Sequence, residues 1–151
     1  MSKRKFKAKV VIAGNKVFVP IPFNANDVWG TKRRHYVTGT INGHTIRGSL
    51  GSDGKNNFLP IGAAWRRDSQ INTGDQVTVI ITPEGPQKES LAPDVATALS
   101  AKPEVLAFFE SFATFYRNTY IKWIESAKRA ETRAARISEM ITLLEAGRKQ
   151  R

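Results

Sequence analysis

The chain has 151 residues, no cysteine and a formal charge of +11 at pH 7. This length suffices for one ordinary domain or for a compact β-domain with a helical appendage. The absence of cysteine excludes disulfides, thiolate metal ligands and thiol nucleophiles, and it favours a reducing compartment, so we expect a cytoplasmic protein. No apolar run approaches the roughly 20 residues of a membrane span, and the run at 10–13 is shorter than the apolar part of a secretory signal, about 7–15 residues.

The positive charge is concentrated in the first half of the chain. Residues 1–86 contain 13 Lys and Arg against 5 Asp and Glu, whereas residues 87–151 contain 11 against 8. Such a surface attracts polyanions, including nucleic acid and phosphorylated metabolites. Charge alone favours an ordinary solvated surface over a specific partner.

Residues 1–86 carry the alternating apolar pattern of β-strands. Asn42-Gly43 is the clearest hairpin signal, because a type I′ turn needs positive φ at both central residues. Gly14-Asn15 predicts a second hairpin, and short helices are expected near 26–29 and 62–70. Closure would remove the exposed edges of so short a sheet, so we expect a small closed β-barrel of about six or seven strands. The strands expected from the pattern are 6–12, 16–20, 36–41, 45–50, 58–61 and 76–82.

Beyond a linker at 87–92, residues 93–151 carry helical periodicity. Pro93 and Pro103 each suit the first turn of a helix, where the missing N–H is tolerated. Three to four helices are expected, and their apolar stripes are predicted to form a core. The fold class is therefore α+β, with the barrel first and the helical module after it. The stripe residues are Val105, Phe108, Phe109, Phe112, Tyr116, Tyr120, Trp123, Ile124, Ile137, Ile141 and Leu144.

Several strings in the chain occur in a recognisable combination. In the second half these are Phe108-Phe109, Arg117–Ile124, Ala127-Lys128, Glu131–Arg133, Arg136-Ile137 and Leu144. They resemble the helical module of the YdeI/OmpD-associated family, also labelled bacteriocin-protection proteins. In the first half Val37–Gly43, Gly48–Leu50, Leu59–Ile61 and Gly74–Val77 resemble the small barrel domain of unknown function that commonly precedes that module. The resemblance implies a barrel followed by helices, without a defined biochemical activity.

The residue pattern offers no catalytic constellation. His35 and His44 are expected in surface turns, and neither has a second ligand at metal-binding spacing, so we expect neither a metal nor a cofactor. The serines lack the Gly-x-Ser-x-Gly context of a nucleophile elbow, and the usual phosphate-binding glycine strings are missing. We therefore expect a protein that is not an enzyme; a weaker alternative is a hydrolase or isomerase assembled only by the fold.

A binding surface is the remaining expectation. Guanidinium groups bind phosphate or carboxylate bidentately, so arginines converging at one barrel mouth would make an anion site. The barrel candidates are Arg33, Arg34, Arg47 and Arg66. In the helical half the candidates are Tyr120, Trp123, Lys128 and Arg133, an aromatic and basic mixture suited to stacking, although their spacing favours core packing for the two aromatics.

These observations predict a non-enzymatic binding or stress-protection protein, of the bacteriocin-protection kind that the resemblance implies, with a basic anion-binding barrel mouth for a small ligand. The alternative is a nucleic-acid-binding protein that uses residues 3–9, residues 32–34 and the basic C-terminal tail. No membrane partner is expected.

Overall fold

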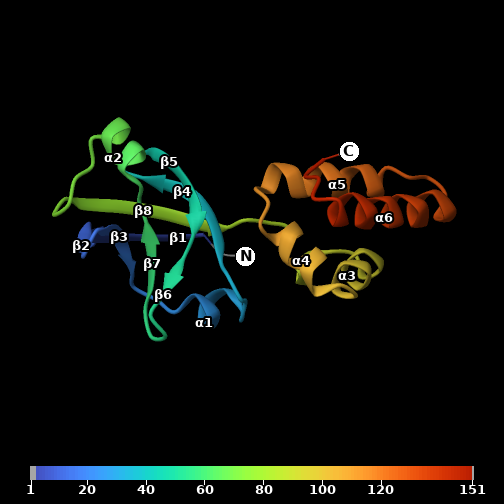
Figure 1. Ribbon diagram of the computed structural model, residues 1–151, viewed down its shortest axis with the longest axis horizontal. Coiled ribbons are helices and arrows are strands. Elements are labelled where there is room, and N and C mark those ends of the chain that lie inside the picture. Colours follow the sequence, from blue (N-terminus) through green and yellow to red (C-terminus); the bar gives the residue numbers. More distant parts are fainter. Residues whose placement is uncertain (1–2, 151) are drawn as a thin grey trace. The chain divides into compact units, whose positions relative to one another are not determined.

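The computed structural model describes residues 3–150, and the chain divides into two compact units, residues 1–83 and residues 84–151 (Figure 1). We call them the β-unit and the helical unit. Each has its own hydrophobic core. The predicted α+β class, with strands in the first half and helices in the second, is confirmed.

The β-unit contains two four-stranded antiparallel sheets. Sheet A has the order β1-β8-β4-β5, with β1 at Arg4–Lys9, β8 at Gln76–Pro83, β4 at Tyr36–Ile41 and β5 at His44–Ser49. Sheet B has the order β2-β3-β7-β6, with β2 at Val11–Ala13, β3 at Lys16–Ile21, β7 at Asn57–Pro60 and β6 at Gly51–Ser52.

The chain passes from sheet A to sheet B at Val10 and again at Leu50, and both residues are buried. The backbone of Val10 is held by Asp75 and Gly74, and the Leu50 amide donates to the His35 carbonyl at 2.9 Å. Strands that change sheets at such bends make the corners of packed β-structures. The segment expected as one strand at 6–12 is therefore two strands. Neither sheet is closed on itself among the described strands, so the single closed barrel stays a prediction.

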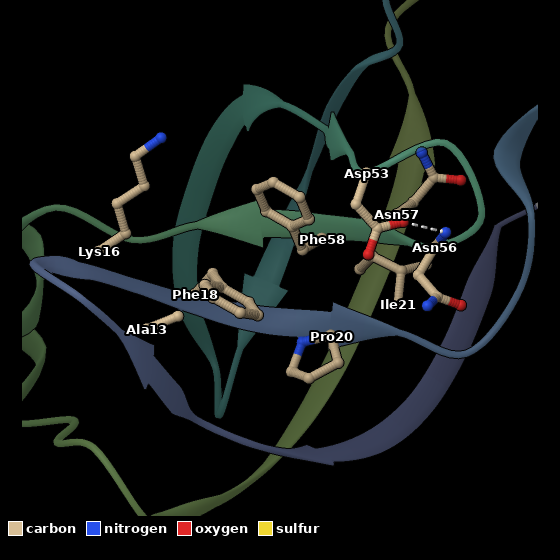
Figure 2. Close-up of a pocket in the computed structure, with 9 residues that line it drawn as sticks. All are labelled: Ala13, Lys16, Phe18, Pro20, Ile21, Asp53, Asn56, Asn57 and Phe58. Atoms are coloured by element: carbon tan, nitrogen blue, oxygen red, sulfur yellow. Dashed lines mark hydrogen bonds between the residues drawn. The ribbon is translucent and has the colours of Figure 1, made fainter.

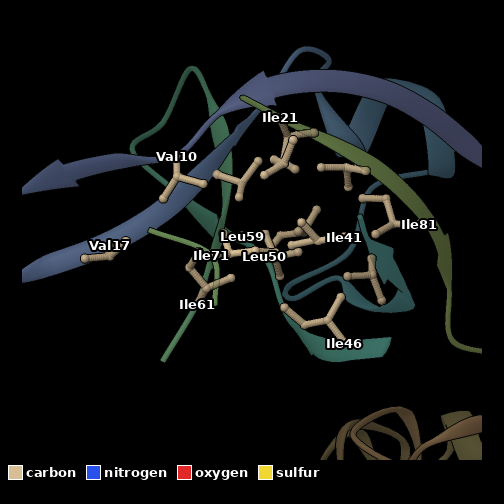
Figure 3. Packing of buried hydrophobic residues seen from close by; sticks show 14 of the residues in the cluster. Val10, Val17, Ile21, Ile41, Ile46, Leu50, Leu59, Ile61, Ile71 and Ile81 are labelled. Atoms are coloured by element: carbon tan, nitrogen blue, oxygen red, sulfur yellow. The ribbon is translucent and has the colours of Figure 1, made fainter. Parts of the chain in front are cut away.

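The space between the sheets is filled by side chains that alternate along the strands. Val77, Val79 and Ile81 of β8 are buried, as are Val19 of β3 and Leu59 of β7. Figure 3 shows Ile81 and Leu59 among the packed aliphatic side chains. Apart from Trp29, the buried members of this core are aliphatic. In β8 the period-two alternation of Val77, Val79 and Ile81 accounts for the inward face.

The short elements of the β-unit also follow local chemistry. Asn42 and Gly43 have φ of 50° and 82°, which confirms the type I′ hairpin. Helix α1 (Ala25–Trp29) covers the short helix expected near 26–29, and it is capped by Asn24, whose side chain accepts from the Asp27 amide. Helix α2 (Ala63–Ser69) lies within the helix expected at 62–70.

The helical unit contains one short 3₁₀ turn, η1 (Lys88–Ser90), and four α-helices among its described residues. Pro93 and Pro103 occupy first-turn positions, as predicted. The buried stripes of the helices, including Phe109, Tyr120 and Met140, form one core. The helices are α3 (Pro93–Ser100), α4 (Pro103–Glu110), α5 (Thr114–Glu125) and α6 (Ala130–Glu145).

A buried arginine fixes the beginning of the helical unit. Arg117 of α5 is 1% exposed, and its Nη1 donates to the carbonyls of Glu84 and Pro86, each at 3.1 Å. Its Nε donates to the Phe112 carbonyl at 3.0 Å. Glu84 and Gln87 are themselves buried. Residues 84–87 are consequently packed against α5 in the helical unit.

Candidate functional site

The four arginines proposed for a barrel mouth have different surroundings. Arg33 and Arg34 are exposed in the segment before β4, and Arg47 is exposed on the outer face of sheet A. Arg66 of α2 is partly buried, and its Nε donates to the Ile61 carbonyl at 3.3 Å. Arg66 lines a groove beside β3 and β7, which is described below. None of the four arginines belongs to the buried core of the β-unit.

The two candidate aromatics of the helical unit belong largely to its interior. Tyr120 is fully buried, and its hydroxyl donates to the Arg148 carbonyl at 3.0 Å. Trp123 is partly buried, and the guanidinium carbon of Arg136 lies 5.4 Å from its ring centre. A buried ring cannot stack on a ligand from solvent. The preference for core packing over a stacking platform is therefore confirmed for Tyr120.

The two candidate cations of the helical unit, Lys128 and Arg133, have different surroundings. Lys128 is exposed between α5 and α6, whereas Arg133 forms a bidentate pair with Asp94, at 2.6 and 2.9 Å. The hydrogen bond from Arg133 lowers the pKa of Asp94, and the same bond raises the pKa of Arg133. Arg133, Asn118 and Glu125 line a groove of about 210 Å³. Because Asp94 already balances the guanidinium, this groove carries no surplus positive charge.

One histidine differs from its expected place. His35 is buried, not in a solvated turn, and its Nε2 lies 2.7 Å from Asn26 Oδ1. Burial, followed by the charge of Lys32, lowers the pKa of the His35 imidazole. The expectation of a surface histidine was wrong because the residue is packed beside Trp29, with ring centres 6.3 Å apart. His44 is exposed, as expected.

The outer faces of the two sheets differ sharply in chemistry. Cross-strand register places Lys, Arg and Thr side chains together with Ile80 on the outer face of sheet A, which is the ordinary polar face of a half-buried sheet. On sheet B the register instead gathers apolar side chains on the outside, namely Val11, Phe18, Pro20, Phe58 and Pro60. We call these five residues the aromatic face. Sheet B is therefore apolar on both sides.

Two rings dominate the aromatic face. Phe18 of β3 and Phe58 of β7 are partly exposed, and their ring centres lie 4.9 Å apart with planes inclined by 47°. Gly51 of β6 pairs with Phe58, and a Cβ on Gly51 would meet the Phe58 ring at 2.3 Å. The ring of Phe58 therefore lies over the bare backbone of Gly51.

Open grooves lie on both sides of this aromatic pair. The first, of about 450 Å³, is drawn in Figure 2 and ends at Asp53 and Asn56. The second, of about 410 Å³, ends at Asn15 and Arg66. Lys16, Phe18 and Phe58 line both grooves. Volumes of this size lie within the usual range of small-molecule sites.

The polar groups at the two ends have opposite character. Lys16 and Arg66 supply positive charge at one end. At the other end backbone amides of Asn56 and then Lys55 lower the pKa of Asp53, so its carboxylate stays ionised. A ligand with a flat apolar part and a negative group can place the ring against Phe18 and Phe58 and the negative group toward Lys16 and Arg66.

Reasoning from sequence missed Phe18, Phe58 and Lys16 as site residues. They were treated only as strand residues, because a continuous apolar run is also typical of a strand buried on both faces. The available signal was that both sets of alternating positions in β3 are apolar, Val17, Val19 and Ile21 on one side and Phe18 and Pro20 on the other. Arg66 was the one predicted residue that shares this surface.

Residues 3–150 contain no group of three or more His, Asp or Glu placed to hold a metal ion. Within the same range, none of the helices is long and apolar enough to cross a membrane.

Comparison with known families follows the division into two units. Residues 90–147 match the family described as bacteriocin-protection, YdeI or OmpD-associated. A comparison with curated proteins found no match. Residues 6–81, half of the chain, match the domain of unknown function DUF1905. The chain thus belongs to the DUF1905 family, and a YdeI or OmpD-associated module follows its DUF1905 domain.

Proposed function

We propose that the chain is a non-enzymatic binding protein whose β-unit accepts an anionic ligand with a planar apolar part on the aromatic face. The observation that carries this proposal is the pair of grooves that share Phe18, Phe58 and Lys16. Solvent-facing sheet surfaces are usually polar, and an exposed apolar patch in a water-soluble unit commonly marks an interaction site.

The sign of the ligand follows from charge. Residues 1–83 hold 13 of the 24 Lys and Arg but 4 of the 13 Asp and Glu. Lys16 and Arg66 lie at the grooves themselves. Of the four arginines predicted for a barrel mouth, Arg66 lines a groove beside sheet B, and we therefore propose the anion site on the outer face of that sheet.

The family description suggests an association with bacteriocin protection. We propose that this protection works by binding, in the cytoplasm, and not by chemical conversion of a substrate. Tyr120 and Arg117 of the helical unit are buried residues, and we propose no ligand contact for them.

Amide NMR with three probes tests the proposal: adenosine monophosphate, adenosine and inorganic phosphate. The monophosphate should bind more tightly than either of the others and shift the amides of β2, β3 and β7. The double variant Lys16→Gln, Arg66→Gln should weaken binding of the monophosphate and leave that of adenosine unchanged.

The matched control is Arg33→Gln, Arg34→Gln, which removes the same charge from two exposed arginines. It should have a much smaller effect. Equal losses in the two double variants, or the absence of shifts on sheet B at saturating probe, would contradict the proposal.

A further inference from the structure

The two grooves beside the aromatic pair form a repeated feature. Each is lined by Lys16, Phe18 and Phe58, and their volumes are nearly equal, about 450 and 410 Å³. A small ligand would occupy only one of the two grooves. Two similar grooves divided by a pair of contacting aromatic rings suit a ligand that itself repeats a planar group at short intervals.

Charge limits what that repeating ligand can be. The β-unit carries a large positive surplus, with 13 Lys and Arg against 4 Asp and Glu in residues 1–83, and two of these cations, Lys16 and Arg66, line the grooves. A polyanion is attracted to such a surface, whereas a second copy of this +11 chain is repelled. Charge complementarity therefore favours an anionic chain over self-association on the aromatic face.

Among biological polyanions, single-stranded nucleic acid combines repeated negative charge with repeated planar rings. Aromatic side chains on a sheet, bordered by cations, bind such strands by stacking unpaired bases. A duplex keeps its bases stacked inside and offers no ring face to the sheet. Resting on the function proposed above, we infer that the ligand is a single-stranded nucleic acid whose neighbouring bases stack on Phe18 and Phe58 while a phosphate faces Lys16 and Arg66.

The charges at the ends of the grooves favour one path for the phosphate backbone of the strand. Phosphates are repelled by the Asp53 carboxylate and attracted by Arg66, so the backbone runs along the Lys16 side. The Asn56 side chain and the Asp53 carboxylate are placed to hydrogen-bond a base edge in the first groove (Figure 2).

Fluorescence anisotropy with a short fluorescein-labelled oligothymidylate tests the inference on the full chain. Phe18→Leu and Phe58→Leu keep an apolar side chain but remove the stacking plane, so each should weaken binding by about ten- to a hundredfold. This reduction should be the same at every salt concentration. Lys16→Gln, Arg66→Gln should instead lower the slope of log K against log salt, by about 0.7 for each phosphate that the variant no longer neutralises.

The matched control is Phe115→Leu. Phe115 lies on α5 of the helical unit and is 70% exposed, so it is the more accessible phenylalanine, yet it should not affect affinity. Unchanged circular dichroism of each variant confirms that the fold is intact. Equal reductions in affinity for Phe115→Leu and Phe18→Leu would overturn the inference.

Competition separates this inference from the proposed function. Inorganic polyphosphate of matched charge should compete weakly, and a duplex of the same length should bind less tightly than the single strand. If polyphosphate binds as tightly as the oligonucleotide and the Phe→Leu variants keep their affinity, base stacking is refuted while an anion site remains. If none of polyphosphate, mononucleotide and oligonucleotide affects the signals of sheet B, both proposals fail.

The oligomeric state provides a further test. Dimerisation that disappears in Phe18→Leu would identify a second copy of the chain as the occupant of the aromatic face and overturn the inference.

Discussion

The ring of Phe58 lies over Gly51, where a Cβ would sit 2.3 Å from a ring carbon. Atoms do not approach this closely, so any side chain at position 51 must move the ring. The position of the Phe58 ring in the aromatic face therefore depends on the smallest residue in the neighbouring strand.

Gly51→Ala should tilt the Phe58 ring away from Phe18 and weaken oligonucleotide binding about as much as Phe58→Leu does. The fold should be kept, at a cost of about 1–3 kcal/mol for the repacked side chain. Anisotropy and urea unfolding measure the two effects. Gly48→Ala is the control, because its Cβ would meet Leu59 at an ordinary 3.4 Å. If Gly51→Ala binds the oligonucleotide as tightly as the wild type does, the orientation of the Phe58 ring does not determine affinity and the prediction is wrong.

Gly39→Ala should be far more damaging to stability than either of these. A Cβ at position 39 would lie 1.8 Å from the Ile80 carbonyl oxygen, which belongs to the backbone in the middle of sheet A. Because β4 and β8 would have to separate, we expect the free energy of unfolding to fall by about 3 kcal/mol or more. Urea unfolding followed by tryptophan fluorescence measures it, and an effect as small as that of Gly48→Ala would contradict the geometry.

Arg117→Met should destabilise the helical unit by about 3 kcal/mol or more. Its guanidinium donates to the carbonyls of Phe112, Glu84 and Pro86, and its removal takes these hydrogen bonds away from the interior of the unit. Arg117→Lys should not restore stability, because an ammonium group lacks the planar fork that reaches several carbonyls. Lys122→Met, an exposed change on the same helix, should stay within about 0.5 kcal/mol. Circular dichroism during urea unfolding distinguishes the three.

The stability of the β-unit should fall on mild acidification. The pKa of His35 in the folded protein lies below its ordinary value of 6.5, so the unfolded chain takes up the proton first as pH falls. The stabilising contribution is therefore complete above about pH 6.5 and is removed between that pH and the lower folded pKa. His35→Gln should abolish this part of the pH dependence, whereas His44→Gln, at an exposed site, should not. Identical pH profiles for wild type and His35→Gln would contradict the account.

Local chemistry explains why much of the fold follows from sequence. The Asn42-Gly43 turn, the helix starts at Pro93 and Pro103 and the inward stripe of β8 depend on residues close together in the chain. The change of sheet at Val10 depends instead on hydrogen bonds to Asp75 and Gly74, which are distant in sequence. Periodicity alone consequently predicted one strand where the structure has two.

The candidate site was harder to predict for a related reason. Charge and residue type singled out Arg66, but they also singled out Arg33, Arg34 and Arg47, whose surroundings differ. What distinguishes the site is cross-strand register, which puts Phe58 beside Phe18 and over Gly51. Register between strands about 40 residues apart is not encoded in local spacing.

The most direct measurement is NMR of the phenylalanine rings, in protein carrying isotope-labelled phenylalanine, during titration with oligothymidylate. Bases stacked on the sheet should shift the ring signals of Phe18 and Phe58 upfield and leave those of Phe115 unchanged. Saturable binding that leaves the signals of Phe18 and Phe58 where they are in the free protein would contradict the central claim.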